Sequence, residues 1–120
     1  KKLVSFKLFG ETYRQNKYAL MLLDVIKLLD KKKPGKLQEL ANRHYSFNST
    51  KRKHVHLNTD GVGMRWPWKL SDTIYLEANL SAWSCIRFID NLISEFGFDR
   101  SQFSFNIGSE ESDESIENEE

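Results

Sequence analysis

The chain has 120 residues and a mass of 14.1 kDa, which suffices for one hydrophobic core and is too little for two. Hydrophobic residues make up 39% and can fill that core, while the longest apolar stretch is too short to cross a bilayer. A single cysteine excludes an internal disulfide framework, and no secretory signal pattern opens the sequence. We therefore expect a single cytoplasmic domain with no membrane contact.

Charge is distributed unevenly along the chain, although the formal net charge is only +1. Residues 110–120 contain seven acidic residues and no basic one, so the rest of the chain has 18 basic against ten acidic residues. Residues 31–69 alone contain ten Lys and Arg against two acidic residues. This asymmetry predicts a polyanionic partner. Residues 109–120 are expected to be a disordered acidic tail, which either competes with that partner or is a passive, solubilising end.

The first half of the chain predicts a strand and two helices. Residues 3–9 alternate between apolar and polar, as in a half-buried strand, and residues 10–14 extend it into a short hairpin. Residues 17–29 predict a helix with Asn16 as its cap. Ten of those thirteen residues are apolar, so this helix should be covered on more than one side. A shorter helix is expected over residues 34–42, with the proline in its first turn.

The second half predicts strands around a further long helix. Residues 54–58 alternate, with His54 and His56 on the outer face, and residues 59–63 have turn chemistry. Pro67 argues against a central strand in the segment that follows. Residues 73–79 form the clearest strand of the sequence.

Ser81 is placed to cap a helix over residues 82–96, and Gly97 is placed to end it. Residues 103–107 alternate as a last strand. The order of elements predicts one α+β domain over residues 1–108. We expect a mixed or antiparallel sheet of about four strands, with two main helices on one face.

Several motifs together resemble a known family. They are FKLFGE at 6–11, RK at 52–53, MRWP at 64–67, IYLEANLSA at 74–82 and LISEFGFD at 92–99. They are similar to an accessory domain found at the C-terminal end of bacterial restriction-type and mobile-element nucleases and related DNA-processing proteins. Ala78 and Phe98 stand where that family usually has Thr and Tyr. The resemblance implies a non-catalytic role beside a nuclease or DNA-modifying protein, as in anti-phage defence.

The candidate nucleic-acid-binding residues combine cationic, aromatic and polar side chains, since phosphates bind Lys and Arg and bases stack on Trp. Two interpretations remain open. The basic run at 51–53 is either a binding surface or a solvated loop, and Asn79 with Ser81 either contacts a phosphate or only forms a turn and a cap. The predicted set is Lys36, Arg43, Lys51, Arg52, Lys53, His54, Arg65, Trp66, Trp68, Lys69, Asn79 and Ser81.

Catalytic and metal-binding patterns are incomplete. His54 and His56 offer two zinc ligands, but no further ligands stand at a suitable spacing. Cys85 falls on an apolar helix face, where a thiol stays protonated and inert. Glu77 and Asp72 lie near a strand end, but no Glu-x-Lys pattern completes a restriction-type nuclease centre. We therefore predict no metal, no cofactor and no enzymatic activity.

The leading hypothesis is a nucleic-acid-binding or substrate-positioning accessory domain, with DNA as the expected partner. The alternative is a protein-interaction or oligomerisation module of the same kind of system, with Trp66, Trp68 and Trp83 as anchors. The two differ in their response to salt. Binding through phosphates weakens steeply as salt rises, whereas an aromatic protein interface is nearly indifferent to it.

Overall fold

The computed structural model describes residues 2–48 and 54–108. The predicted tail at 109–120 and the basic residues Lys51, Arg52 and Lys53 lie outside these ranges. The described elements are, in chain order, β1 (Lys2–Leu8), β2 (Glu11–Arg14), α1 (Tyr18–Lys32), α2 (Lys36–Asn42), β3 (Leu57–Asn58), β4 (Pro67–Ser71), β5 (Ile74–Glu77), α3 (Ala82–Glu95), a 3-10 turn (Arg100–Gln102) and β6 (Phe103–Gly108). The predicted α+β class is confirmed.

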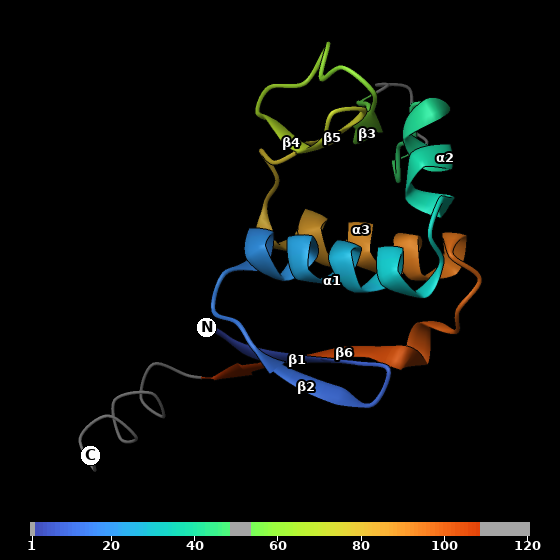
Figure 1. Ribbon diagram of the computed structural model, residues 1–120. Helices are drawn as coiled ribbons and strands as arrows, with labels where there is room; N and C mark the ends of the chain where they lie inside the picture. The colour runs from blue at the N-terminus through green and yellow to red at the C-terminus, as the bar shows by residue number, and fades with distance from the viewer. Residues whose placement is uncertain (1, 49–53, 109–120) are drawn as a thin grey trace.

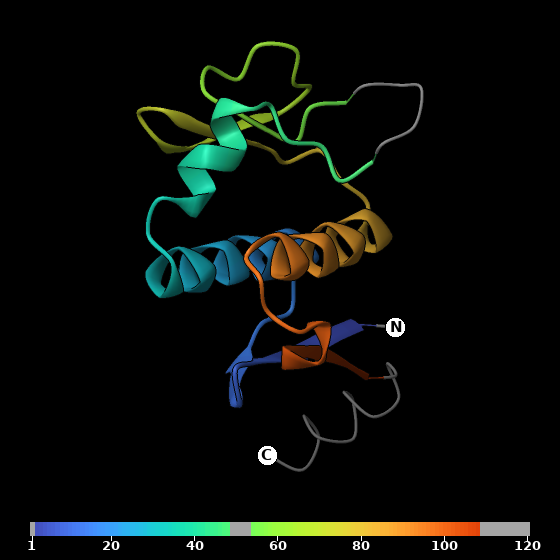
Figure 2. The same cartoon turned by 90° about the vertical axis from the view of Figure 1, so that its right-hand side faces the viewer.

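The described elements stack in three layers (Figures 1 and 2). A sheet of order β2-β1-β6 forms one outer layer, and α1 and α3 lie side by side in the middle. A second sheet of order β3-β5-β4, together with α2, forms the other outer layer. The helix pair is therefore enclosed between two sheets. None of the helices within residues 2–48 and 54–108 has the length and apolar character needed to cross a bilayer.

The predicted single sheet of about four strands, with both helices on one face, is wrong. The described strands instead form two antiparallel sheets of three strands each, on opposite sides of the helix pair. The physical reason is the width of the apolar stripe on each helix, because a sheet on one side leaves the other part of that stripe in water. The buried residues of α1 are Met21, Leu22, Val25, Ile26 and Leu29.

α3 follows its sequence signals closely. The hydroxyl oxygen of Ser81 accepts a hydrogen bond from the backbone N–H of Ser84 at 3.1 Å, so Ser81 is the predicted N-cap. Gly97 follows the helix with a φ of 85°, in the left-handed region that favours glycine. Local signals at both ends were therefore sufficient to place this helix.

The other two helices begin later than predicted. The N-cap of α1 is Lys17 and not Asn16, and no side chain of the described residues forms a cap hydrogen bond there. α2 begins at Lys36, after Pro34, because Gly35 occupies the N-cap with a φ of 93°. The left-handed conformation of Gly35 keeps the preceding proline out of the helix.

The predicted strand at 54–58 is largely irregular, and only Leu57–Asn58 pairs with β5. The backbone N–H groups of His56 and Leu57 both donate to the carbonyl of Tyr45, at 2.8 and 3.1 Å, which breaks the strict alternation of side chains. The predicted outward position of His56 is therefore wrong. Its side chain is buried and its ring packs 4.1 Å from that of Phe47, centroid to centroid. His54 is exposed, so the two imidazoles do not share a face.

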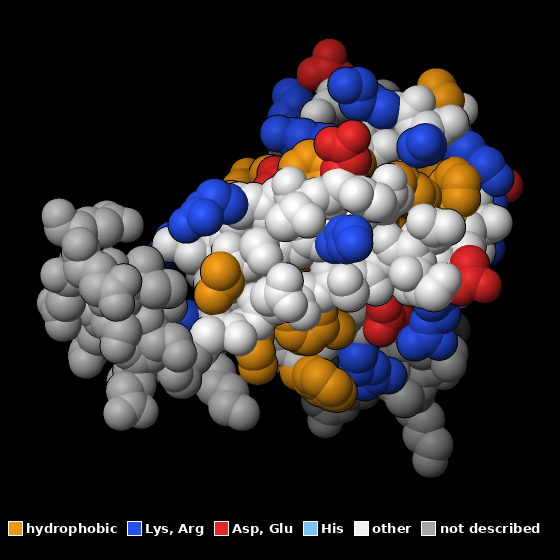
Figure 3. All heavy atoms as spheres, turned by 90° about the horizontal axis from the view of Figure 1, so that it is seen from below, with side chains coloured by type: hydrophobic (Ala, Val, Ile, Leu, Met, Phe, Trp, Pro, Cys, Tyr) orange, Lys and Arg blue, Asp and Glu red, His pale blue; other side chains and the backbone are white. Residues whose placement is uncertain are grey.

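The outer face of the β2-β1-β6 sheet is polar. Lys7 pairs with Thr12 on one side and with Ser104 on the other, so these side chains share that face. Side chains that are neither apolar nor charged, together with backbone, cover most of this view, and the apolar patches are separate (Figure 3). Among the described residues, this face presents no continuous apolar surface.

Candidate functional site

A hollow of about 430 Å³ lies between the β4–β5 hairpin and the first turn of α1. We call it the tryptophan hollow. Its volume falls within the range typical of ligand pockets. It is mostly apolar, because five of the six residues that line it carry apolar side chains or indoles. The lining residues are Lys17, Ala19, Leu20, Trp66, Trp68 and Ala78.

Strand register explains why both indoles face the helix layer. Trp68 pairs with Leu76, and the N–H of Ala78 donates to the carbonyl of Trp66 at 2.9 Å, so Trp66 lies opposite Ala78. Partners across an antiparallel pair share one face of the sheet, and Leu76 on that face is fully buried. Ala78, which follows β5, and Ala19 of α1 both line the hollow, and their small side chains leave space in it.

The two indoles differ in burial. Trp68 is half-buried and packs against the core, whereas Trp66 is 66% exposed. Aromatic ring pairs are frequent elsewhere in the described residues, but neither indole takes part in one there. The hollow therefore has an indole against the core and another at its rim, and neither is stacked on another aromatic ring of the described residues.

A buried carboxylate holds the chain at the rim. Glu77 accepts the backbone N–H of Arg65 at 2.8 Å through Oε1, and those of Trp66 and Asn79 at 3.0 Å through Oε2. Burial by itself raises the pKa of Glu77, but these three donors and the nearby His56 outweigh it and keep the pKa below its ordinary value. The charged carboxylate thus fixes the backbone that carries Trp66. Sequence reasoning weighed Glu77 only as a catalytic acid and missed this role.

Two cations beside the hollow carry uncompensated charge. Lys17 lines the hollow and Arg65 precedes Trp66; both are exposed, and neither has an ion-pair partner among the described residues. Three other cations of the predicted set are neutralised by acids. These ion pairs join Lys36 to Glu39 at 2.7 Å, Arg43 to Glu95 at 2.9 Å, and Lys69 to Asp72 at 3.2 Å.

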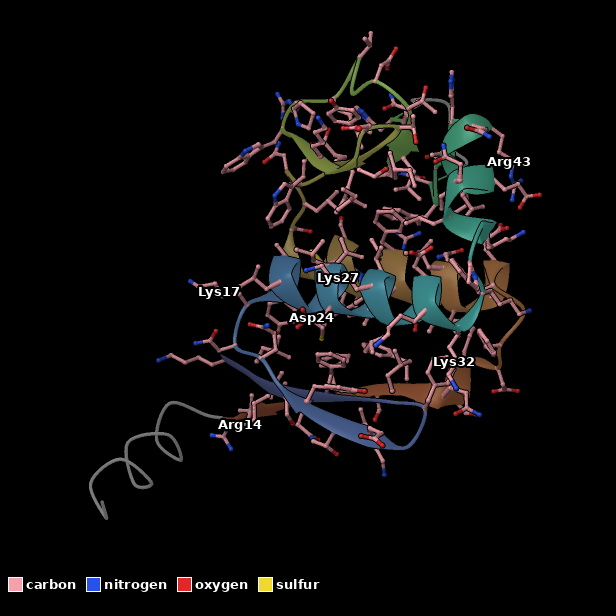
Figure 4. The ribbon with its side chains drawn as sticks, viewed as in Figure 1. Arg14, Lys17, Asp24, Lys27, Lys32 and Arg43 are labelled. Carbon is pink, nitrogen blue, oxygen red and sulfur yellow. The ribbon has the colours of Figure 1, made fainter. Side chains whose placement is uncertain are left out.

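The predicted binding residues do not form one surface. Figure 4 shows Lys17 at the N-terminal end of α1 and Arg43 on the opposite side of the molecule, at the C-terminal end of α2. Trp66 and Trp68 belong to the side of Lys17. Among the predicted residues, Trp66 and Trp68 line the hollow with Arg65 beside them, whereas Lys36 and Arg43 lie at the two ends of α2.

The remaining predicted residues have structural roles or stand apart. Ser81 caps α3, so the interpretation as a cap is confirmed for it. Asn79 donates its backbone N–H to Glu77 and keeps an exposed side chain. Sequence reasoning missed Lys17 and Ala78 as parts of the hollow, because only the packing of α1 against the second sheet brings them together. No local pattern marks that contact.

Other reactive groups are unavailable or scattered. Cys85 is buried in α3, and burial raises the pKa of its thiol to about 11, so the thiol stays protonated at neutral pH as predicted. No group of three potential metal-ligating side chains occurs within residues 2–48 and 54–108.

Comparisons with protein-family models, curated proteins and solved structures give no match to this chain. The resemblance to accessory domains of DNA-processing proteins therefore stays a prediction from the sequence motifs. What the site does has to be inferred from its own residues.

Proposed function

We propose that this domain binds nucleic acid through the tryptophan hollow and the cations beside it. It does so as a non-catalytic, cytoplasmic accessory domain of a bacterial DNA-processing or defence system, with DNA as the expected partner. The observation that carries the proposal is that two indoles line the hollow while Lys17 and Arg65 beside it have no ion-pair partner among the described residues. Nucleic-acid surfaces combine these two features, because phosphates need cations and bases offer flat faces for stacking.

The charge of the whole chain supports this choice of partner. Outside residues 110–120, basic residues exceed acidic ones by 18 to ten. A positive excess of this size attracts polyanions over a distance of about 10 Å at moderate salt. We leave Lys36 and Arg43 out of this surface, because both are paired with acids. We place the binding surface at the hollow.

The alternative function is protein interaction, and the exposure of two tryptophans favours it. Trp66 is 66% exposed and Trp83 is 67% exposed, and exposed indoles are frequent anchors at interfaces. Strand addition at the nearby sheet edge is disfavoured, because the edge strand β4 begins with Pro67 and carries Lys69. The cations at the hollow favour an anionic ligand over an apolar protein surface.

The test is a binding titration of the full chain against fluorescein-labelled duplex and single-stranded oligonucleotides at increasing salt. We expect affinity to fall steeply as salt rises. The double variant Lys17→Ala/Arg65→Ala should weaken binding and reduce the salt slope by about two. The matched control is Lys2→Ala/Lys7→Ala, since both of these exposed lysines lie in β1, beyond the helix layer. The control should retain the slope of the wild type.

Binding that is indifferent to salt would contradict the proposal. Equal losses in the two double variants would also contradict it, because they would show a diffuse charge effect with no preferred surface. Loss of self-association in Trp83→Ala, in the absence of any oligonucleotide binding, would favour the interaction module.

A further inference from the structure

We infer that the tryptophan hollow holds one unpaired base of a nucleic-acid strand, with a neighbouring phosphate at Lys17. The inference rests on the proposed function and goes beyond it, because it names the part of the ligand that the hollow accepts. It predicts that the domain recognises a base outside the double helix. Three features of the hollow support this inference: its shape, the chemistry of its lining and the hydrogen bonds that hold its rim.

The shape of the hollow requires a group that projects from the rest of the ligand. Trp68 lies against the core while Trp66 is at the exposed rim, so a ligand must enter between the strand and α1 to cover both indoles. In a perfect duplex both faces of each base are covered by neighbouring bases. Only a base that has left its stack can offer a face to an indole.

The lining residues favour a ligand that has a flat apolar group and, next to it, a negatively charged group. Ala19, Leu20 and Ala78 provide apolar walls, and Lys17 is the charged side chain among the described lining residues. A methylated ammonium group also stacks on indoles, but the positive charge of Lys17 repels it. A nucleotide within a strand meets both requirements, since its base is planar and its phosphate is anionic.

The rim of the hollow is held before any ligand arrives. The carboxylate of Glu77 accepts the N–H groups of Arg65 and Trp66 from the loop and of Asn79 from the start of the connection to α3. The carbonyl of Trp66 in turn accepts the N–H of Ala78. A binding group fixed in this way loses little conformational freedom when the ligand binds. The exposed indole at the rim is thus attached to an ordered backbone.

The first part of the test compares three fluorescein-labelled DNA probes at about 0.1 M salt: a perfect duplex, the same duplex with a one-nucleotide bulge, and that bulge made abasic. An unpaired base costs least to extrude when it is already outside the stack. We expect the bulged duplex to bind about tenfold tighter than the other two, from the stacking of one base. Equal affinity for the intact and abasic bulges would overturn the inference.

The second part fills the hollow. Ala78→Leu keeps both indoles and all charges but occupies the space between the strand and α1, so the preference for the bulge should disappear. Thermal unfolding shows whether this variant folds. If it does not, Ala19→Leu replaces it, because it fills the hollow from the opposite wall. Trp83→Ala is the matched control, because this indole is equally exposed and does not line the hollow. It should keep the preference.

A preference for the bulge that survives in a folded, filled variant would overturn the inference. So would tighter binding of deoxyadenosine monophosphate than of the bulged strand, because the occupant would then be a free nucleotide. Failure of the proposed function gives a different result: none of the three probes would bind in a salt-dependent way.

Discussion

Glu77 shows how a single side chain connects the core to the surface. Its buried carboxylate accepts hydrogen bonds from three backbone N–H groups of exposed residues. Two of these groups belong to the loop that carries Trp66, and the third belongs to Asn79 in the connection from β5 to α3. The position of the exposed indole therefore depends on the charge and geometry of one buried group.

We expect Glu77→Gln to lower the free energy of unfolding by about 1–3 kcal/mol. The glutamine NH2 group cannot accept a hydrogen bond, so it would face a backbone N–H group that now bonds to a carboxylate oxygen. The same variant should weaken the preference for an unpaired base, since the rim is no longer held. Urea unfolding and the bulge assay measure the two effects. Asp72→Asn is the control, as Asp72 is exposed and forms only a surface ion pair with Lys69. Wild-type stability in Glu77→Gln would show that the carboxylate does not hold the loop.

The burial of His56 predicts a dependence of stability on pH. Burial lowers the pKa of His56 to about 4, helped by the nearby His54 and opposed by Glu77. In the unfolded chain the pKa returns to 6.5, so the unfolded state binds more protons between these two values. Stability should therefore fall by about 1–2 kcal/mol between pH 7 and pH 5. Glu77 adds a loss only below pH 4.5, since its pKa is lowered from that value in the folded state.

Urea unfolding of the wild type and of His56→Phe at pH 7 and pH 5 tests this. Phenylalanine suits the aromatic surroundings of Phe47 and Phe88 but cannot be protonated, so its stability should change little over this range. The fall should persist in His54→Ala, because that imidazole is exposed. An equal fall in His56→Phe would assign the pH dependence to other groups.

Among the elements, α3 is the central one, because it packs beside α1 between the two sheets. Ile89 on its buried face is fully inaccessible to solvent. We expect Ile89→Asp to abolish cooperative unfolding, since an isolated buried carboxylate has no partner there. Ala82→Asp is the control, because Ala82 is exposed in the first turn, where an acid is favourable. A cooperative unfolding transition in Ile89→Asp would contradict this packing.

The elements also show which parts of the fold the sequence could predict. α3 was predicted closely because its cap, apolar stripe and terminal glycine are local signals. The division into two sheets was not predicted, because β1 pairs with β6 at the other end of the described chain. Alternation within a strand indicates burial but does not identify the partner strand. The burial of His56 was missed for a related reason, as the carbonyl of Tyr45 interrupts the strand.

The candidate site was predictable only in part. Trp66 and Trp68 were predicted from their residue type and their place in a basic segment. Lys17 and Ala78 join them through the packing of α1 on the second sheet, which no sequence pattern marks. The cations Lys36 and Arg43 were expected on the same surface. Figure 4 shows Arg43 on the other side of the molecule, and the two cations pair with Glu39 and Glu95.

On the scale of the whole molecule, α1 is shared by the core and the site. It separates the two sheets, and its first turn forms one wall of the tryptophan hollow. The hollow is thus lined by the start of α1, by the start of β4 and by Ala78, which follows β5. These segments meet only in the folded domain. Binding at the hollow should therefore report on the intact fold.

The most direct test of the central claim is the quenching of tryptophan fluorescence by a single-stranded oligonucleotide in wild type and in three single variants: Trp66→Phe, Trp68→Phe and Trp83→Phe. A base that stacks on an indole quenches its emission. Our account predicts that quenching persists in Trp83→Phe and is reduced in each of the other two, because only those indoles line the hollow. Binding without quenching, or quenching lost only in Trp83→Phe, would contradict it.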